Sequence, residues 1–119
     1  MGEIKSFEEF WPFYVGEHRN PLNRKLHFIG SSLGLAWGLG SLATLQWWAF
    51  PVAPVIGYGF AWVGHFFVEK NKPASFKYPL WSFRADWVMW SKILRGKMDA
   101  EVDKYFPVEA ARVLRMAAN

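Results

Sequence analysis

Residues 26–68 read LHFIGSSLGLAWGLGSLATLQWWAFPVAPVIGYGFAWVGHFFV, a run of 43 residues without a single Asp, Glu, Lys or Arg. A membrane-spanning helix needs about 20 consecutive apolar residues, so the run is long enough for two. A water-soluble domain of 119 residues could bury one such helix, but hiding two would leave little chain to cover them. We therefore expect an integral membrane protein built on a transmembrane hairpin.

The two spans are predicted over residues 28–49 and 55–69. Between them lies the sequence FPVAPV, in which Pro51 and Pro54 are expected to break the helix. A hairpin of this kind brings the start of its first helix beside the end of its second.

Three glycines recur at four-residue spacing in the first predicted span, at Gly30, Gly34 and Gly38. Small residues at this spacing form a ridge that lets a second helix approach closely. The ridge predicts a tight hairpin, and it also offers a face through which a homo-oligomer could form.

An aromatic helix is predicted before the hairpin, over residues 6–15 (SFEEFWPFYV). Ser6 followed by Glu9 matches a capping box, the usual start signal of a helix. Aromatic side chains then recur at helical spacing, at Phe7, Phe10, Trp11 and Tyr14. Beside such long apolar segments, we expect this amphipathic helix to lie in the membrane interface.

A third apolar helix is predicted over residues 79–95. It includes Arg84 and Asp86, which fit either a short third span with a polar pair or a helix lying in the membrane plane. One helical face carries Leu80, Phe83, Trp87, Trp90 and Leu94. Residues 99–117 are expected to form a second, charged amphipathic segment on the membrane surface. The predicted fold is all-α, a helical bundle forming a single membrane-embedded domain over residues 1–119.

The positive charges flank the predicted hairpin and are missing from its turn. The positive-inside rule therefore places both ends of the hairpin in the cytoplasm, at the plasma or inner membrane of a bacterium or the endoplasmic reticulum of a eukaryote. Attraction to anionic lipid headgroups explains the net charge of +4 better than a nucleic-acid partner does. The absence of cysteine excludes disulfides and thiolate metal ligands.

The chain has three histidines, and all lie at the ends of the charge-free run: His18, His27 and His65. A single helical histidine is more often a hydrogen-bonded core residue than a ligand, but three at one end of a hairpin raise the prospect of a metal or cofactor site. Counted from the predicted turn, His27 lies roughly 36 Å along its helix and His65 about 20 Å, so the first helix would need to tilt or begin later.

Further polar residues accompany these histidines. Glu69 follows His65 by four positions and so shares its helix face, where it could ligate a metal, orient a ligand or pair with a lysine. Asn20 and Asn23 bracket a proline and could orient an imidazole or a bound water.

Two stretches, FYVGEHRNPLNRKLHFIG and GYGFAWVGHFFVEKNKPASF, resemble the paired signatures of the 2-hydroxy fatty acid dioxygenases. This family is named for the metabolism of phytosphingosine to odd-numbered fatty acids. The resemblance covers roughly residues 10–95. The matching positions are His18, Asn20, Pro21, Asn23, His27, Gly64, His65, Glu69, Lys70, Pro73 and Ala74.

The resemblance implies an oxidoreductase of lipid metabolism, an Fe(II)-dependent membrane enzyme of fatty acid α-oxidation. Such an enzyme uses O2 to shorten a 2-hydroxy fatty acid by one carbon and releases CO2. Carried over by position, His18, His27 and His65 would bind the iron, with Glu69 beside them. The substrate carboxylate could pair with nearby cations, and the candidates are Arg19, Arg24, Lys70 and Lys72. Asn20 and Asn23 are further candidates for binding the substrate, and Glu69 joins the three histidines as a candidate catalytic residue.

Two other classes of function stay open at this point. One is a haem-binding or electron-carrying membrane protein with His27 and His65 as axial ligands. The other is a non-enzymatic membrane scaffold whose histidines hydrogen-bond the helix ends.

Overall fold

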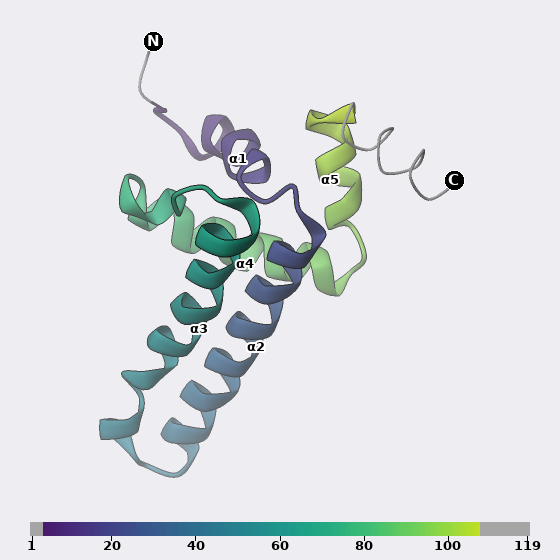
Figure 1. Cartoon of the computed structure of the whole chain (residues 1–119). Helices are drawn as coiled ribbons and strands as arrows, with labels where there is room; N and C mark the ends of the chain where they lie inside the picture. Colours follow the sequence, from purple (N-terminus) through teal and green to yellow (C-terminus); the bar gives the residue numbers. More distant parts are fainter. Residues whose placement is uncertain (1–3, 108–119) are drawn as a thin grey trace. The chain divides into compact units, whose positions relative to one another are not determined.

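A computed structural model of the chain describes residues 4–107, and these residues form five α-helices joined by short 3-10 and π-helical segments (Figure 1). The predicted all-α fold is confirmed. The chain divides into two compact units. The described part of the first unit comprises residues 4–19 and 74–107, and the second unit is residues 20–73.

The second unit is a helical hairpin. Its first leg is α2, Pro21–Ala43, and its second leg consists of the 3-10 segment η1, Trp47–Ala49, the helix α3, Val52–Val63, and the π-helix η2, Gly64–Glu69. A short turn at residues 44–46 joins the two legs, which lie side by side in Figure 1.

The first leg is displaced from its predicted span of 28–49, and the second leg begins before the predicted residue 55 but ends at Glu69 as predicted. Helix α2 starts at Pro21 rather than near residue 28, because Asn20 caps it and proline is well suited to a first helical position. The turn comes before Pro51 and Pro54, which occupy the start of α3. There the missing proline N–H costs little, so these prolines begin a helix instead of breaking one. The two legs are of equal length, 23 residues each, and the expected mismatch in depth between His27 and His65 disappears.

The glycine ridge of α2 packs against α3, as a tight hairpin requires. A Cβ atom added at Gly30 would lie 2.5 Å from the Cβ of Phe60 and 3.1 Å from the carbonyl oxygen of Gly57. At Gly34 it would lie 2.9 Å from the carbonyl oxygen of Ala53. Only glycine allows this approach of the two backbones, and the ridge is occupied by a helix of the same chain.

Two helical segments among residues 4–107 are long and apolar enough to cross a membrane, Pro21–Ala43 and Trp47–Glu69. Only 28% and 17% of their most apolar stretches are buried inside the protein. The large apolar side chains that point outward include Leu33, Leu39, Leu42, Val55, Val63 and Phe67. The hairpin therefore presents to its surroundings a surface that suits hydrocarbon.

The first unit consists of α1, Phe7–Gly16, the 3-10 segment η3, Ala74–Phe76, α4, Pro79–Leu94, and α5, Met98–Tyr105. Ser6 caps α1 by accepting a hydrogen bond from the backbone N–H of Glu9, as the capping pattern predicts.

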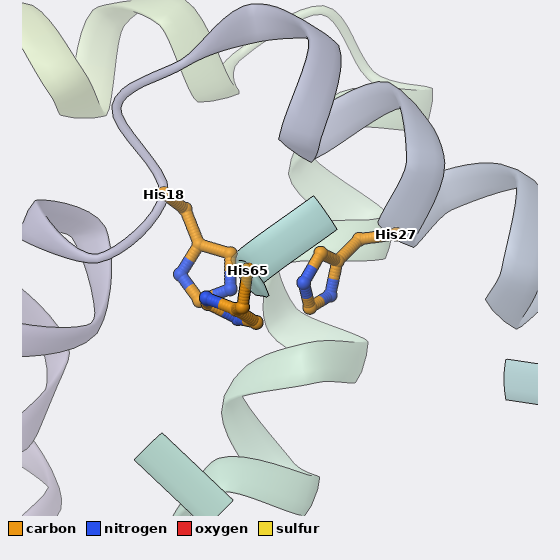
Figure 2. Close-up of side chains that lie close together, drawn as sticks. All are labelled: His18, His27 and His65. Carbon is orange, nitrogen blue, oxygen red and sulfur yellow. The ribbon is translucent and has the colours of Figure 1, made fainter. Parts of the chain in front are cut away.

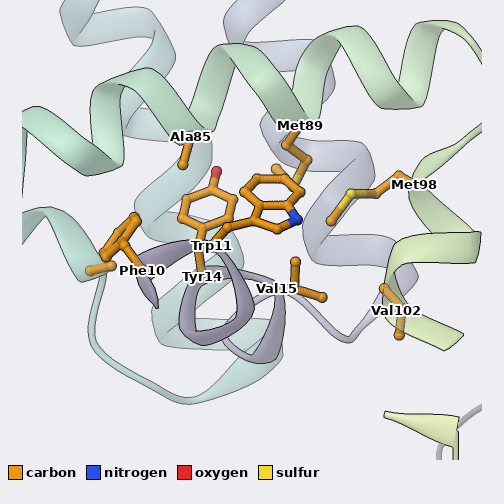
Figure 3. Packing of buried hydrophobic residues seen from close by; sticks show 9 residues of the cluster. Phe10, Trp11, Tyr14, Val15, Ala85, Met89, Met98 and Val102 are labelled. Carbon is orange, nitrogen blue, oxygen red and sulfur yellow. The ribbon is translucent and has the colours of Figure 1, made fainter. Parts of the chain in front are cut away.

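The aromatic stripe of α1 packs into the interior of the first unit (Figure 3). Phe10 and Tyr14 are almost completely buried against side chains of α4 and α5. The expectation that this stripe faces the membrane interface is therefore wrong for these residues, because the protein itself supplies the apolar partner. The buried cluster contains Phe10, Trp11, Tyr14, Val15, Ala74, Ala85, Met89, Met98 and Val102.

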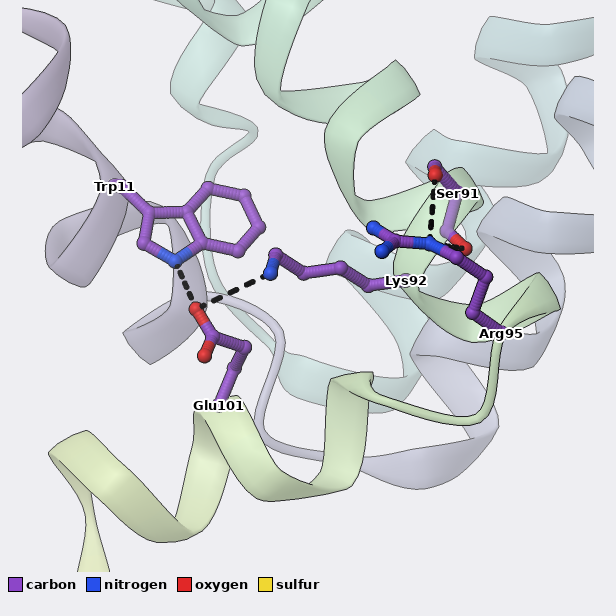
Figure 4. Close-up of polar contacts among 5 residues, drawn as sticks. All are labelled: Trp11, Ser91, Lys92, Arg95 and Glu101. Carbon is purple, nitrogen blue, oxygen red and sulfur yellow. Dashed lines mark hydrogen bonds and ion pairs between the residues drawn. The ribbon is translucent and has the colours of Figure 1, made fainter.

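Polar contacts tie α5 to its neighbours in this unit (Figure 4). The indole N–H of Trp11 donates to Oε1 of Glu101 over 2.7 Å, and Nζ of Lys92 lies 3.8 Å from the same oxygen. Of the amphipathic segment predicted over 99–117, residues 99–105 belong to α5, and residues 108–117 lie outside the described residues.

The helix predicted over 79–95 is present as α4, but Arg84 and Asp86 do not face one another. The guanidinium of Arg84 lies 4.0 Å from the centre of the Phe7 ring, whereas Asp86 accepts a hydrogen bond from the hydroxyl of Tyr14. Residues two apart on a helix point in different directions, so each finds its own neighbour on α1.

We expect the same substitution, glycine to alanine, to have different effects at Gly34, which lies on the glycine ridge, and at Gly40, which lies outside it. Gly34→Ala should destabilise the hairpin by about 1–3 kcal/mol, because the new Cβ meets backbone of Ala53. Gly40→Ala should be neutral or stabilising by up to about 1 kcal/mol, because nothing lies within 4 Å of its Cβ position and alanine favours helix. Thermal unfolding in detergent measures both, and equal effects of the two substitutions would contradict the packing.

Asp86 should make stability depend on pH. Burial raises the pKa of its carboxyl from 3.8 to about 7, against the opposing effect of the Tyr14 hydrogen bond. The fold therefore favours the protonated form, and this stabilisation is full below about pH 4 and lost as the pH rises through 7. Asp86→Asn keeps a neutral oxygen acceptor for Tyr14, so its melting temperature should fall less between pH 5 and pH 8 than that of the wild type. An equal fall in melting temperature in the two proteins between pH 5 and pH 8 would refute the assignment.

Candidate metal site

His27 and His65 meet inside the second unit. His27 lies in the second turn of α2, and His65 lies in η2 at the end of the other leg. Both side chains are buried, and their ring centroids lie 5.0 Å apart with the ring planes at 89° (Figure 2). The hairpin thus brings together two imidazoles that are 38 positions apart in the chain, with candidate ligand nitrogens within 4.8 Å of each other.

The π-helical turn at Gly64–Glu69 sets the position of His65. A short π-helix widens the helix by one residue per turn, and such segments are frequent at functional sites. A Cβ at Gly64 would collide with the side chain of Asn23 on α2, so glycine is required where the two legs meet. Lys70 ends the segment in the left-handed conformation, with φ 60°, and turns the chain back toward His65.

Glu69 joins the ends of the two legs. One of its carboxylate oxygens accepts hydrogen bonds from the backbone N–H of Asn20, over 2.5 Å, and from the side-chain amide of Asn23, over 3.4 Å. A carboxylate at a helix N-terminus is also favoured by the helix dipole. Asn20 in turn caps α2 by accepting from the N–H of Leu22. Through these contacts, Glu69 and the two asparagines hold the end of η2 against the start of α2.

Asn71 orients His65, a contact that the sequence analysis missed. Nδ1 of His65 lies 2.7 Å from Oδ1 of Asn71. An amide oxygen only accepts hydrogen bonds, so Nδ1 carries the proton and Nε2 keeps its lone pair. A metal-binding histidine is commonly fixed in this way by an acceptor on its other nitrogen. The contact depends on the left-handed turn at Lys70, and no spacing rule in the sequence predicts it.

His18 belongs to the first unit, where Tyr14 holds it. Its Nδ1 lies 2.7 Å from the carbonyl oxygen of Tyr14, and the two rings stack with centroids 4.0 Å apart. His18 is fully buried, and its Nδ1 donates to that carbonyl, which again leaves Nε2 as the lone-pair nitrogen. The part of Tyr14 was also missed, although its position four residues before His18 on a helical pattern is a usable signal.

Chain continuity links His18 to the hairpin, because only Arg19 separates it from Asn20, the capping residue of α2. The three buried histidines, His18, His27 and His65, could hold a metal ion. Imidazole nitrogen suits iron, zinc, copper and nickel, so the donor set alone leaves the metal open.

The four candidate cations differ in their surroundings. Arg24 is buried and lies three residues before His27, on the same side of α2. Arg19 contacts its own unit, donating from Nε to the carbonyl oxygen of Gly16 with its guanidinium 4.7 Å from the centre of the Phe106 ring. Lys70 and Lys72 are exposed.

The fold and the site together define this chain as an all-α protein with an apolar helical hairpin and a candidate metal site of buried histidines. The particular family is given by comparison with known proteins. Residues 4–98 match the family described as 2-hydroxy-palmitic acid dioxygenase Mpo1-like, and the chain belongs to this family. The resemblance drawn from the two motifs is thereby confirmed. Searches of curated proteins and of solved structures find no significant match.

The hydrogen bond between Asn71 and His65 predicts a loss of metal affinity in Asn71→Ala. Removing such an orienting acceptor typically costs 10–100-fold in affinity, about 1.4–2.7 kcal/mol. Titration of the detergent-purified protein with Co(II), followed by visible absorption, measures the change. Gln46→Ala is the matched control, because it removes an exposed amide in the turn at the other end of the hairpin. Equal Co(II) affinity in the two variants would show that Asn71 does not orient a ligand.

Proposed function

We propose that this protein is an Fe(II)-dependent dioxygenase of fatty acid α-oxidation. It converts a 2-hydroxy fatty acid and O2 into the fatty acid one carbon shorter, CO2 and water. The observation that carries the proposal is the buried pair His27 and His65 at the helix ends, in a chain whose family is named for 2-hydroxy-palmitic acid. The family name makes 2-hydroxypalmitic acid the first substrate to test.

His18, His27 and His65 would hold the iron. Three neutral imidazoles suit Fe(II) and leave coordination positions open for other ligands. The contacts of His18 with Tyr14 and of His65 with Asn71 support this role, because both leave Nε2 as the donor. O2 has two unpaired electrons and reacts only slowly with an organic acid, which has none. When bound, Fe(II) would supply the redox chemistry that allows the two to react.

The reaction balances without an added reductant. The bond between the carboxyl carbon and Cα breaks, the carboxyl carbon leaves as CO2, and Cα becomes the new carboxyl carbon. Cα gives up three electrons and the original carboxyl carbon one, and these four electrons reduce O2. Of the five oxygen atoms that enter, two leave in the new acid, two in CO2 and one in water.

Arg24 is the cation best placed to receive the substrate carboxylate. It is buried on the same side of α2 as His27, and a guanidinium binds a carboxylate through two parallel hydrogen bonds. Arg19, Lys70 and Lys72 would add positive potential at the entrance. Glu69, Asn20 and Asn23 would keep the helix ends in register around the bound substrate.

The alkyl tail of the substrate suggests a membrane location. The hairpin would span the bilayer with both ends in the cytoplasm, where the flanking cations lie, and the exposed Trp47 and Trp48 beside the turn would anchor the opposite interface. The apolar tail could then remain among lipid chains along the hairpin while the hydroxy acid reaches the histidines.

The haem alternative receives less support from the geometry. Axial ligands face each other across a macrocycle, whereas the rings of His27 and His65 are in direct edge-to-face contact at 5.0 Å. The scaffold alternative predicts that the histidines contribute stability alone, and it is separated from the enzyme by the experiment below.

The decisive measurement uses the full chain purified in detergent without oxygen. After addition of Fe(II), O2 and 2-hydroxypalmitic acid, we expect one iron per chain and the one-carbon-shorter acid as product. Palmitic acid, which lacks the hydroxyl, should not react. His65→Ala should lose at least 100-fold in turnover and lose the bound iron.

Ser41→Ala is the matched control for that variant. Ser41 is a buried polar residue of α2 that donates to the carbonyl oxygen of Trp37, about 21 Å along the helix from His27. Its loss should leave turnover and iron content unchanged. Absence of the shortened product, with wild type and His65→Ala behaving alike, would overturn the proposal.

A further inference from the structure

Helix α4 carries an apolar face that is exposed at Leu80, Phe83 and Leu94 and half-buried at Trp87 and Trp90. Its buried face consists of the small or flexible residues Ser82, Ala85 and Met89. Of the larger apolar side chains, Leu80 is 84% exposed and Leu94 62%. We define the α4 stripe as the apolar residues at alternating spacings of three and four, which are Leu80, Phe83, Trp87, Trp90 and Leu94.

The aromatic members of the α4 stripe touch one another in sequence. The ring centroids of Phe83 and Trp87 lie 6.4 Å apart, and those of Trp87 and Trp90 lie 5.7 Å apart. They form a continuous aromatic ridge along the middle of the helix, with an aliphatic residue at either end. Tryptophan is the residue that favours the boundary between headgroups and acyl chains, because its ring is apolar and its N–H is polar.

The charge along α4 and its flanking residues is mostly positive, although Lys92 lies 3.8 Å from Glu101 on α5. Between residues 77 and 97 the only acid is Asp86, which hydrogen-bonds to Tyr14 of the same unit. The cations in this range are Lys77, Arg84, Lys92, Arg95 and Lys97. A helix that combines an exposed apolar face with surrounding cations suits an anionic lipid surface. A second copy of the same face would set cations against cations, which opposes self-association.

We propose that the α4 stripe binds the surface of an anionic lipid bilayer, with α4 lying in the plane of the interface. The helix has 16 residues and so is about 24 Å long, which is short of the ~30 Å hydrocarbon core. The inference rests on insertion of the hairpin into the bilayer, and the experiment reads that insertion separately.

The chain has no cysteine, so single cysteines can carry a nitroxide label. The label is placed at Leu80→Cys, Phe83→Cys or Leu94→Cys for the α4 stripe. Leu39→Cys, on the outward face of α2, reports hairpin insertion, and Asp103→Cys, an exposed position on α5, reports water. The full-length protein is reconstituted into vesicles of phosphatidylcholine with phosphatidylglycerol, and the accessibility of each label to O2 and to a water-soluble nickel chelate is measured.

We expect the three stripe labels to lie at one shallow depth, with an O2-to-nickel ratio several-fold above that of Asp103→Cys and below that of Leu39→Cys. Removing phosphatidylglycerol should lower the ratio at all three. Water-like values at the stripe, with Leu39→Cys deep in lipid, would overturn the inference while leaving hairpin insertion intact.

Three other results would also overturn the inference. Depth that increases steadily from residue 80 to residue 94 would indicate a spanning helix. Spin–spin broadening that grows with the protein-to-lipid ratio would indicate a second copy as partner. A water-exposed label at Leu39 would remove hairpin insertion itself, and with it the proposed membrane location.

Discussion

The close approach of α2 and the second leg of the hairpin is the constraint on which the rest of the second unit depends. Gly30 and Gly34 let the α2 backbone contact the backbone and Cβ atoms of α3, with no room for a larger residue. In a setting where lipid competes for apolar side chains, helices associate through such small-residue packing and through polar contacts. This packing aligns two legs of equal length, and the alignment puts His27 opposite His65.

Polar contacts at the helix ends complete the arrangement. Glu69 links the end of one leg to the beginning of the other, and Asn71 fixes the ring of His65. In the first unit, the buried Tyr14 supplies the carbonyl oxygen that fixes His18 and also donates its hydroxyl hydrogen to Asp86. A candidate metal site of this kind therefore depends on acceptors that lie behind the imidazoles as much as on the imidazoles themselves.

The sequence predicted the type of each main element and missed details that depend on packing. The hairpin, the helix over 79–95 and the cap at Ser6 could be predicted, because they follow from charge-free length, helical spacing and a capping pattern. The effect of Pro51 and Pro54 was predicted wrongly, because a proline that starts a helix and one that ends it look alike until the turn is known. The aromatic stripe of α1 was assigned to the membrane interface, although Phe10 and Tyr14 pack inside the first unit. Periodicity shows that a face is apolar and leaves its partner undetermined.

The sequence by itself determined the helical class and the family membership and named three histidines as candidate ligands, since these follow from local composition and from two long motifs. The tertiary structure decided which side chains serve those histidines. Asn71 reaches His65 only because Lys70 adopts a left-handed conformation, and Gly64 meets Asn23 only because the two legs pack together there. It also decided that α4 buries Ser82, Ala85 and Met89 and exposes Leu80, Phe83 and Leu94. Each of these outcomes depends on contacts between distant residues, and contacts of that kind have no signature in local spacing.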